Sequence, residues 1–120
     1  MKISAAESVV MEALWRESPR TSESIMSEVS GPQDWTEGTV KVLISRLVKK
    51  KAVAAKADGR RYLYTPLLSR QAYVQSESQG LLDRLFDGRL APLVMHFSDG
   101  DKLSDEDVAA LKALVDRIGK

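Results

Sequence analysis

Basic side chains are concentrated in one part of the chain, the segment 35–66, WTEGTVKVLISRLVKKKAVAAKADGRRYLYTP. They are Lys41, Arg46, Lys49, Lys50, Lys51, Lys56, Arg60 and Arg61. The acidic residues of the segment are Glu37 and Asp58, and the whole chain has a net charge of +1. Ammonium and guanidinium groups gathered in this way attract anions, and on a helix followed by a hairpin they are typical of a surface that binds nucleic-acid phosphates.

Residue types that catalyse reactions or bind transition metals are scarce. The chain has no cysteine, and His96 is its single histidine. We therefore expect no thiol chemistry, no metal and no cofactor. The run of acids Asp105, Glu106 and Asp107 is explained by the preference for negative charge at a helix N-terminus. Because no two carboxylates form a convincing acid–base pair, an enzyme is the class of function that we expect least.

Length and composition are those of a small globular protein. The chain has 120 residues, of which 43% are hydrophobic and 29% are charged. No apolar run approaches the roughly 20 residues of a membrane span, and the N-terminus has no signal-peptide pattern, so we predict a cytoplasmic protein. Acidic residues outnumber basic ones beyond Pro66. We therefore expect the first half of the chain, and not the second, to contact nucleic acid.

Three helices are predicted ahead of the basic hairpin. Capping residues and helical periodicity predict a helix over about 5–17, which Pro19 ends, and a short second helix within 20–29. Turn-forming residues follow over 30–34. Thr36 is the expected N-cap of the third helix, because its hydroxyl can accept a hydrogen bond from a backbone N–H of the first turn.

The third predicted helix has an apolar face and a basic face. The apolar residues recur at helical spacing and are expected in the core: Val40, Leu43, Ile44, Leu47 and Val48. The opposite face carries Gly38, Lys41, Val42, Ser45, Arg46 and Lys49. A bidentate donor, a small hydroxyl and an apolar group that can meet a thymine methyl suit a helix in the major groove of DNA. For this helix taken alone, a merely solvated basic face is the alternative interpretation.

A hairpin is predicted directly after this helix, with strands over 53–57 and 62–65 around a turn at 58–61. The predicted fold class is therefore mainly α with a small β-wing, a winged helix-turn-helix. In that arrangement the basic wing tip reaches phosphates or the adjacent minor groove, although such a tip by itself could simply be a solubilising loop. The predicted base contacts are Thr39, Val42, Ser45 and Arg46, and the predicted phosphate contacts are Lys41, Lys49, Arg60 and Arg61.

Three further apolar helices are predicted over 69–86, over 89–97 and after Ser104. Little of a complete winged helix remains for them to pack on, so we expect them to wrap around the same segment of a second copy as an intertwined homodimer. We predict a DNA-binding domain at 1–66 and a helical dimerisation domain at 67–120. The expected dimerisation residues are Leu81, Leu82, Leu85, Phe86, Leu90, Leu93, Val94, Phe97, Val108, Leu111, Leu114, Val115 and Ile118.

The order of elements and several runs resemble the penicillinase-repressor family of bacterial transcription regulators, of the BlaI/MecI type. The runs are TVKVLISRLVKKKAV, YLYTP, LLDRLFDG, LAPLVMHF and LSDEDVAALKALVDRI, and together they extend the resemblance over nearly the whole chain. The resemblance implies a homodimeric repressor that binds inverted-repeat operators in double-stranded DNA, in promoters of antibiotic-resistance or metal-response operons. It also implies that a membrane-bound sensor metalloprotease leads to cleavage of the repressor at an Asn-Phe bond.

Two departures from the family pattern bear on regulation. The cleaved bond corresponds by position to His96-Phe97, so a histidine replaces the family's asparagine. A helix end packed in the dimer core is the alternative interpretation of this pair, and for Phe97 it is the one we favour. Copper-responsive relatives carry a C-terminal cysteine motif, and the absence of cysteine here excludes copper sensing of that kind.

Two other functions stay open at this stage. One is a small-molecule-responsive winged-helix regulator, with an effector pocket between the winged helix and the tail. The other is a winged helix used for protein–protein contacts, which leaves the basic face of the third helix without an explanation.

Overall fold

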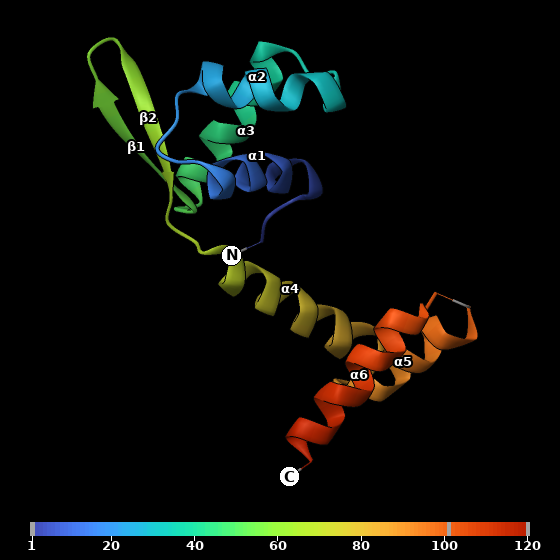
Figure 1. Cartoon of the computed structure of the whole chain (residues 1–120). Coiled ribbons are helices and arrows are strands. Elements are labelled where there is room, and N and C mark those ends of the chain that lie inside the picture. The colour runs from blue at the N-terminus through green and yellow to red at the C-terminus, as the bar shows by residue number, and fades with distance from the viewer. Residues whose placement is uncertain (1, 101, 120) are drawn as a thin grey trace. The chain divides into compact units, whose positions relative to one another are not determined.

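The computed structural model describes residues 2–100 and 102–119, and this part of the chain forms helices and one two-stranded sheet (Figure 1). The elements are α1 (Ala5–Arg16), α2 (Ser22–Gln33), α3 (Glu37–Lys49), β1 (Val53–Asp58), β2 (Arg61–Pro66), α4 (Arg70–Leu85), α5 (Leu90–Asp99) and α6 (Asp105–Ile118). The chain divides into two compact units between Val74 and Gln75, within α4. None of the helices in the described ranges has the length and apolar character needed to cross a membrane.

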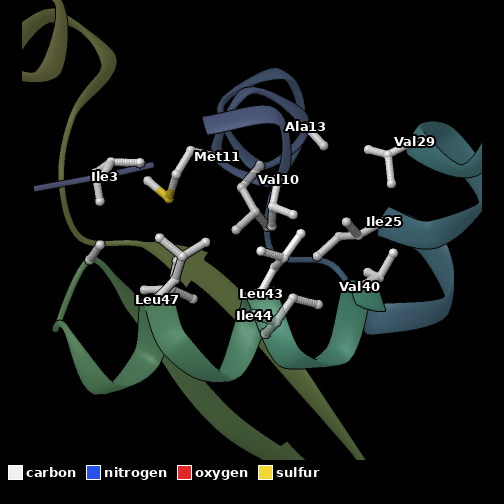
Figure 2. Packing of buried hydrophobic residues seen from close by; sticks show 13 residues of the cluster. Ile3, Val10, Met11, Ala13, Ile25, Val29, Val40, Leu43, Ile44 and Leu47 are labelled. Atoms are coloured by element: carbon white, nitrogen blue, oxygen red, sulfur yellow. The ribbon is translucent and has the colours of Figure 1, made fainter. Parts of the chain in front are cut away.

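The first unit is built around a core that α1, α2 and α3 share. Side chains from all three helices point into one space in Figure 2, and Val53 at the start of β1 belongs to the same cluster. On α3 the buried residues are those predicted, namely Val40, Leu43, Ile44 and Leu47, with Val48 half-buried. Burying each such side chain contributes about 1.5–3 kcal/mol, so packing holds α3 with its basic face outward.

Side-chain caps begin α1 and α3 where the sequence predicted them. The Ser4 hydroxyl accepts a hydrogen bond from the Glu7 amide at 3.1 Å, while the Glu7 carboxylate accepts one from the Ser4 amide at 2.8 Å. At the start of α3, the Thr36 hydroxyl accepts a hydrogen bond from the Thr39 amide at 3.2 Å. Each contact satisfies a backbone donor that the first helical turn leaves without a helical partner.

The turn predicted over 30–34 is wrong, because α2 continues through Pro32 before it ends. Its C-cap is Asp34, which has a φ of 55° and donates its amide hydrogen to the carbonyl of Ser30 at 2.7 Å. Proline lacks the amide of a helical residue and disfavours helix before it, which is why the local sequence suggests a turn. In the last turn, however, it removes a single hydrogen bond, and burial of Val29 in the core holds the helix in place.

The predicted hairpin is confirmed, with a tighter turn than expected. Asp58 pairs with Arg61 in the last step of the antiparallel ladder, so Gly59 and Arg60 alone form the loop instead of 58–61. Gly59 has a φ of +66°, which is what the first central position of a type II′ turn requires. Three helices followed by this hairpin make a winged helix, as predicted.

The wing is fastened to the helices by the connection between α1 and α2. The amide of Arg20 donates to the carbonyl of Tyr64 in β2 at 3.1 Å, and the amide of Tyr64 donates to the carbonyl of Arg20 at 2.8 Å. The start of α4 packs on the same unit, because the indole of Trp15 donates to the carbonyl of Leu68 at 2.8 Å and lies 5.5 Å from the ring of Tyr73. The Arg20–Tyr64 pairing thus joins β2 to the connection between α1 and α2, and the Trp15 contacts join the start of α4 to α1.

The second unit contains the end of α4 together with α5 and α6. The helices predicted here are confirmed, and α5 ends at Asp99 rather than at Phe97. Ser104 caps α6 as predicted, since its hydroxyl accepts a hydrogen bond from the Asp107 amide at 3.0 Å. Within one chain, none of the residues that the structure describes in α4, α5 and α6 is buried. This unit therefore has no closed core of its own.

Candidate nucleic-acid interface

The predicted DNA-contacting residues are all exposed on the first unit. Val42 is 50% exposed, although it is an apolar residue on a helix that packs well on its other side. The α3 members are Thr39, Lys41, Val42, Ser45, Arg46 and Lys49, and the wing members are Arg60 and Arg61. Exposure leaves these side chains available to a partner, while the core behind α3 keeps them on one outward face.

A groove of about 410 Å³ lies between the start of α2, the basic face of α3 and the wing, and we call it the α3–wing groove. It brings together four of the predicted residues, Lys41, Ser45, Arg60 and Arg61. The other predicted residues do not line it; they continue the exposed face of α3 beyond the groove. The structure thus joins the helix and the wing into one basic surface, as a bound polyanion would require.

The other residues that line this groove were absent from the predicted site, and they are Thr21, Ser22, Glu23, Ile44, Val48, Ala55, Tyr62 and Tyr64. Tyr62 and Tyr64 lie on the same face of β2, with ring centroids 6.5 Å apart, and Tyr62 is 54% exposed. Because the two tyrosines alternate directly after Arg60 and Arg61, the sequence alone could have assigned them to this site. Thr21 and Ser22 reach the groove from the start of α2, and no local pattern marks them because the fold alone brings them to the wing.

Lys41 is the basic residue of this surface that carries an acidic neighbour on the same helix. Its Nζ lies 3.0 Å from Oε1 of Glu37, one turn earlier, and both side chains are more than half exposed. The hydrogen bond to Glu37, and then the negative charge of that carboxylate, raise the pKa of Lys41. Lys41 is therefore fully charged at neutral pH, and its ammonium group is already occupied in the free protein.

Lys50 belongs to the basic run, but it forms an ion pair inside the winged helix. Its Nζ lies 2.5 Å from Oε1 of Glu7 and donates to the carbonyl of Lys2 at 2.9 Å. Glu7 is 1% exposed, and its Oε2 has no hydrogen-bond partner among the described residues. Burial by itself raises the pKa of Glu7, but hydrogen bonds from Lys50 and Ser4 outweigh it, so the pKa lies below its usual value. The charge of Lys50 is thus compensated inside the protein.

Arg20 is a second basic residue used for structure, since only 8% of it is exposed. Its guanidinium donates to the carbonyl of Ala13 at 3.0 Å, to both oxygens of Ser24 at 2.9 Å and to Oε1 of Glu28 at 2.8 Å. Arg16 also pairs with Glu28, and hydrogen bonds from Arg20 and then Arg16 lower the pKa of that carboxyl. This network ties the end of α1 to α2, next to the backbone pairing that holds the wing.

A second, apolar surface lies on the other unit. The predicted dimerisation residues are half-buried or exposed, and among them Leu85 and Leu90 are each 60% exposed, Val115 is 64% exposed and Ile118 is 72% exposed. Two open apolar grooves of about 500 and 350 Å³ lie along α5 and α6, and Val94, Leu103 and Leu111 line both. Exposed apolar surface of this kind marks an interaction site.

The bond predicted by resemblance as a cleavage site, His96-Phe97, lies inside α5. Both side chains are exposed in the single chain. The ring of His96 lies 5.5 Å from that of Phe97 and 6.3 Å from that of Phe86. A peptide bond inside a helix is hydrogen-bonded on both sides, so a protease reaches it only after local unfolding of α5.

The chain is similar to known bacterial repressors over almost its whole length. The sequence model of one family, described as Penicillinase repressor, matches residues 3–117. The chain is 30% identical to the penicillinase repressor of Bacillus licheniformis over 115 residues, which are 96% of this chain and 90% of that protein. It is 26% identical to the methicillin resistance regulatory protein MecI of Staphylococcus aureus strain N315 over 116 residues, 97% of this chain and 94% of that one.

A solved structure matches the winged helix. It is the solution structure of the monomeric form of BlaI from Bacillus licheniformis in complex with the blaP half-operator. The match has a TM-score of 0.54 and 32% identity, and it covers 61% of this chain and 89% of that chain.

Proposed function

Because the chain belongs to the penicillinase repressor family, we propose that it represses transcription by binding an operator in double-stranded DNA through its winged helix. The observation that carries this proposal is the α3–wing groove, where Lys41 and Ser45 of α3 meet Arg60 and Arg61 of the wing. The similar BlaI monomer has been solved in complex with the blaP half-operator, which supports DNA binding by a winged helix of this kind. The chromosome lies in the cytoplasm of a bacterium, and we propose that location for the protein.

In the proposed complex, α3 lies in the major groove. Thr39, Val42, Ser45 and Arg46 contact base edges, and Lys41, Lys49, Arg60 and Arg61 contact phosphates. Exposure of every one of these side chains supports the assignment. Lys50 takes no part, because Glu7 already compensates its charge. Tyr62 extends the contact surface of the wing, since its ring is exposed on the groove side.

We propose that a second copy of the chain covers the apolar surface of α4, α5 and α6. The support is the lack of any buried residue among those described in these helices, together with the two apolar grooves along α5 and α6. Residues 67–120 then act as the dimerisation region and 1–66 as the DNA-binding domain. A homodimer presents two copies of α3 to the two halves of an inverted repeat. Once one copy is bound, the second half-site is bound within the same complex, so the affinity of the dimer exceeds that of a single winged helix.

The names of the relatives lead us to propose that the regulated operon is of the β-lactam-resistance type. We further propose that a membrane-bound sensor protease relieves repression by cleavage at His96-Phe97. Since this bond lies inside α5, cleavage requires that α5 open first, and it then separates the end of α5 and the whole of α6 from the DNA-binding unit.

The experiment that tests this function is binding of the purified protein to its own upstream promoter, against a scrambled duplex of equal length, across a series of salt concentrations. We expect a preference of about a thousandfold or more for the promoter and a steep loss of affinity as salt rises. Equal affinity for both duplexes contradicts sequence-specific repression at that promoter. Absence of binding at low salt contradicts DNA binding altogether.

A further inference from the structure

An acidic residue opens the helix that we propose to contact DNA. Glu37 is the first residue of α3, and its Oε1 accepts a hydrogen bond from Nζ of Lys41 at 3.0 Å. The two side chains are 58% and 57% exposed, so both are accessible to a partner. A second acid, Glu23, lines the α3–wing groove together with Lys41. In the free protein, the Lys41 ammonium is paired with Glu37 and shares the groove with Glu23, and Arg61 of the wing likewise lies 3.4 Å from Asp58.

Helix stability explains part of this arrangement. An acid in the first turn interacts favourably with the helix dipole, and Glu followed by Lys one turn later is the better orientation of such a pair. Exposed pairs of this kind are worth little, however, and they are weakened by salt. This pair bears on DNA binding because Lys41 lines the same groove as Arg60 and Arg61.

A DNA phosphate that approaches Lys41 competes with Glu37 for one ammonium group. The displaced carboxylate then lies close to the phosphate backbone, and like charges repel. Both effects oppose every DNA sequence equally, since phosphates carry no sequence information. Only an operator supplies base contacts along α3 that offset the opposition.

We propose that Glu37 lowers the sequence-independent part of DNA affinity by holding Lys41 away from phosphates. The proposal rests on the DNA-binding function proposed above. A repressor must find its operator among a very large excess of other sites, and attraction to phosphates supplies essentially all of the affinity for those sites. An acid at the start of α3 makes stable binding depend more strongly on base contacts.

The test compares purified full-length Glu37→Gln with the purified wild-type protein, on the promoter duplex and on a random duplex, across a series of salt concentrations. We expect Glu37→Gln to bind the random duplex about two- to fivefold more tightly at low salt, because one negative charge leaves the interface. The plot of log affinity against log salt should become steeper by up to about one unit. Glu37→Ala repeats the test with a side chain that cannot accept the hydrogen bond from Lys41.

Two controls separate this role from a general change in charge or helix stability. Glu17→Gln changes the net charge equally at an exposed site at the end of α1, where no ion pair involves Glu17 within residues 2–100 and 102–119. Introducing Glu37→Gln into a Lys41→Met background should give a smaller gain, since the lysine to be released is absent. A loss of helix stability alone would weaken binding and leave the salt dependence unchanged.

The proposal is overturned if Glu37→Gln and Glu17→Gln bind random DNA alike, or if Glu37→Gln loses affinity only for the operator, which would indicate a base contact by Glu37. The wild-type measurement distinguishes a failure of the role proposed for Glu37 from a failure of the proposed DNA-binding function. A wild-type protein that binds DNA with a steep salt dependence preserves the proposed function even when the Glu37 variants show no gain. A wild-type protein that binds no DNA overturns both.

Discussion

Lys50→Met tests whether the buried carboxylate of Glu7 needs its cation. Glu7 is 1% exposed, and the Lys50 ammonium at 2.5 Å is the positive charge paired with it. Removing one partner of a buried pair costs about 3–5 kcal/mol, and because Lys50 is about one-third exposed we reduce that figure to about 2–4 kcal/mol. The methionine keeps most of the apolar stem of the lysine, so the loss reports on charge rather than on packing.

The loss should depend on pH in a defined direction. In the wild type, the pKa of Glu7 lies below its ordinary value, so its contribution to stability is present above that value and is lost as the pH falls through the folded pKa. In Lys50→Met, burial without the ammonium raises the pKa of Glu7 instead, and protonation relieves the buried charge. The difference in stability between variant and wild type should therefore be largest near neutral pH and should shrink as the pH falls toward about 4 to 5.

Urea unfolding followed by tryptophan fluorescence measures this effect in the winged helix. The two tryptophans of the chain, Trp15 and Trp35, both lie in the first unit, so the signal reports on that unit. The double variant Glu7→Gln/Lys50→Met is the matched control, because it removes both charges and should recover part of the loss. A destabilisation of Lys50→Met below about 0.5 kcal/mol at neutral pH, or an equal destabilisation at neutral pH and at about pH 4 to 5, would show that Glu7 does not need the Lys50 cation.

Three further predictions concern DNA and assembly. Arg46→Ala should cost about 1–3 kcal/mol of operator affinity and relax specificity, whereas Lys49→Ala should weaken binding to operator and random duplexes alike; identical behaviour of the two variants on both duplexes excludes base contact by Arg46. A chain cut after Val74 should stay folded as a monomer, because it keeps Leu68 and Tyr73 packed beside Trp15, and should bind the operator much more weakly; sedimentation that still shows a dimer contradicts the role of the tail. Val115→Asp should shift the full-length protein toward monomer, and an unchanged dimer excludes this part of α6 from the interface.

Local sequence patterns were sufficient to predict the elements of the winged helix and the faces of α3. Helical periodicity predicted that Val40 and Leu47 lie in the core. The capping preference of threonine predicted that α3 begins directly after Thr36. These signals act over one or two helical turns, so they can be recognised without knowledge of the rest of the chain. The same locality explains the error at Pro32, where burial of the preceding turn outweighs the local preference for a turn. The assignment of base contacts and dimer contacts stays a prediction.

The folded structure was needed to show which charged side chains form internal ion pairs and which remain on the surface. In the sequence, Lys49 and Lys50 are adjacent lysines of one basic run. In the structure, Lys50 pairs with Glu7, which is 43 positions away in the sequence, and Lys49 stays exposed. Arg20 appears as a surface residue beside a proline, but the packing of α1 against α2 surrounds it with acceptors and buries it. The energy of a charge depends on the partners and the solvent around it, and elements distant in sequence supply both.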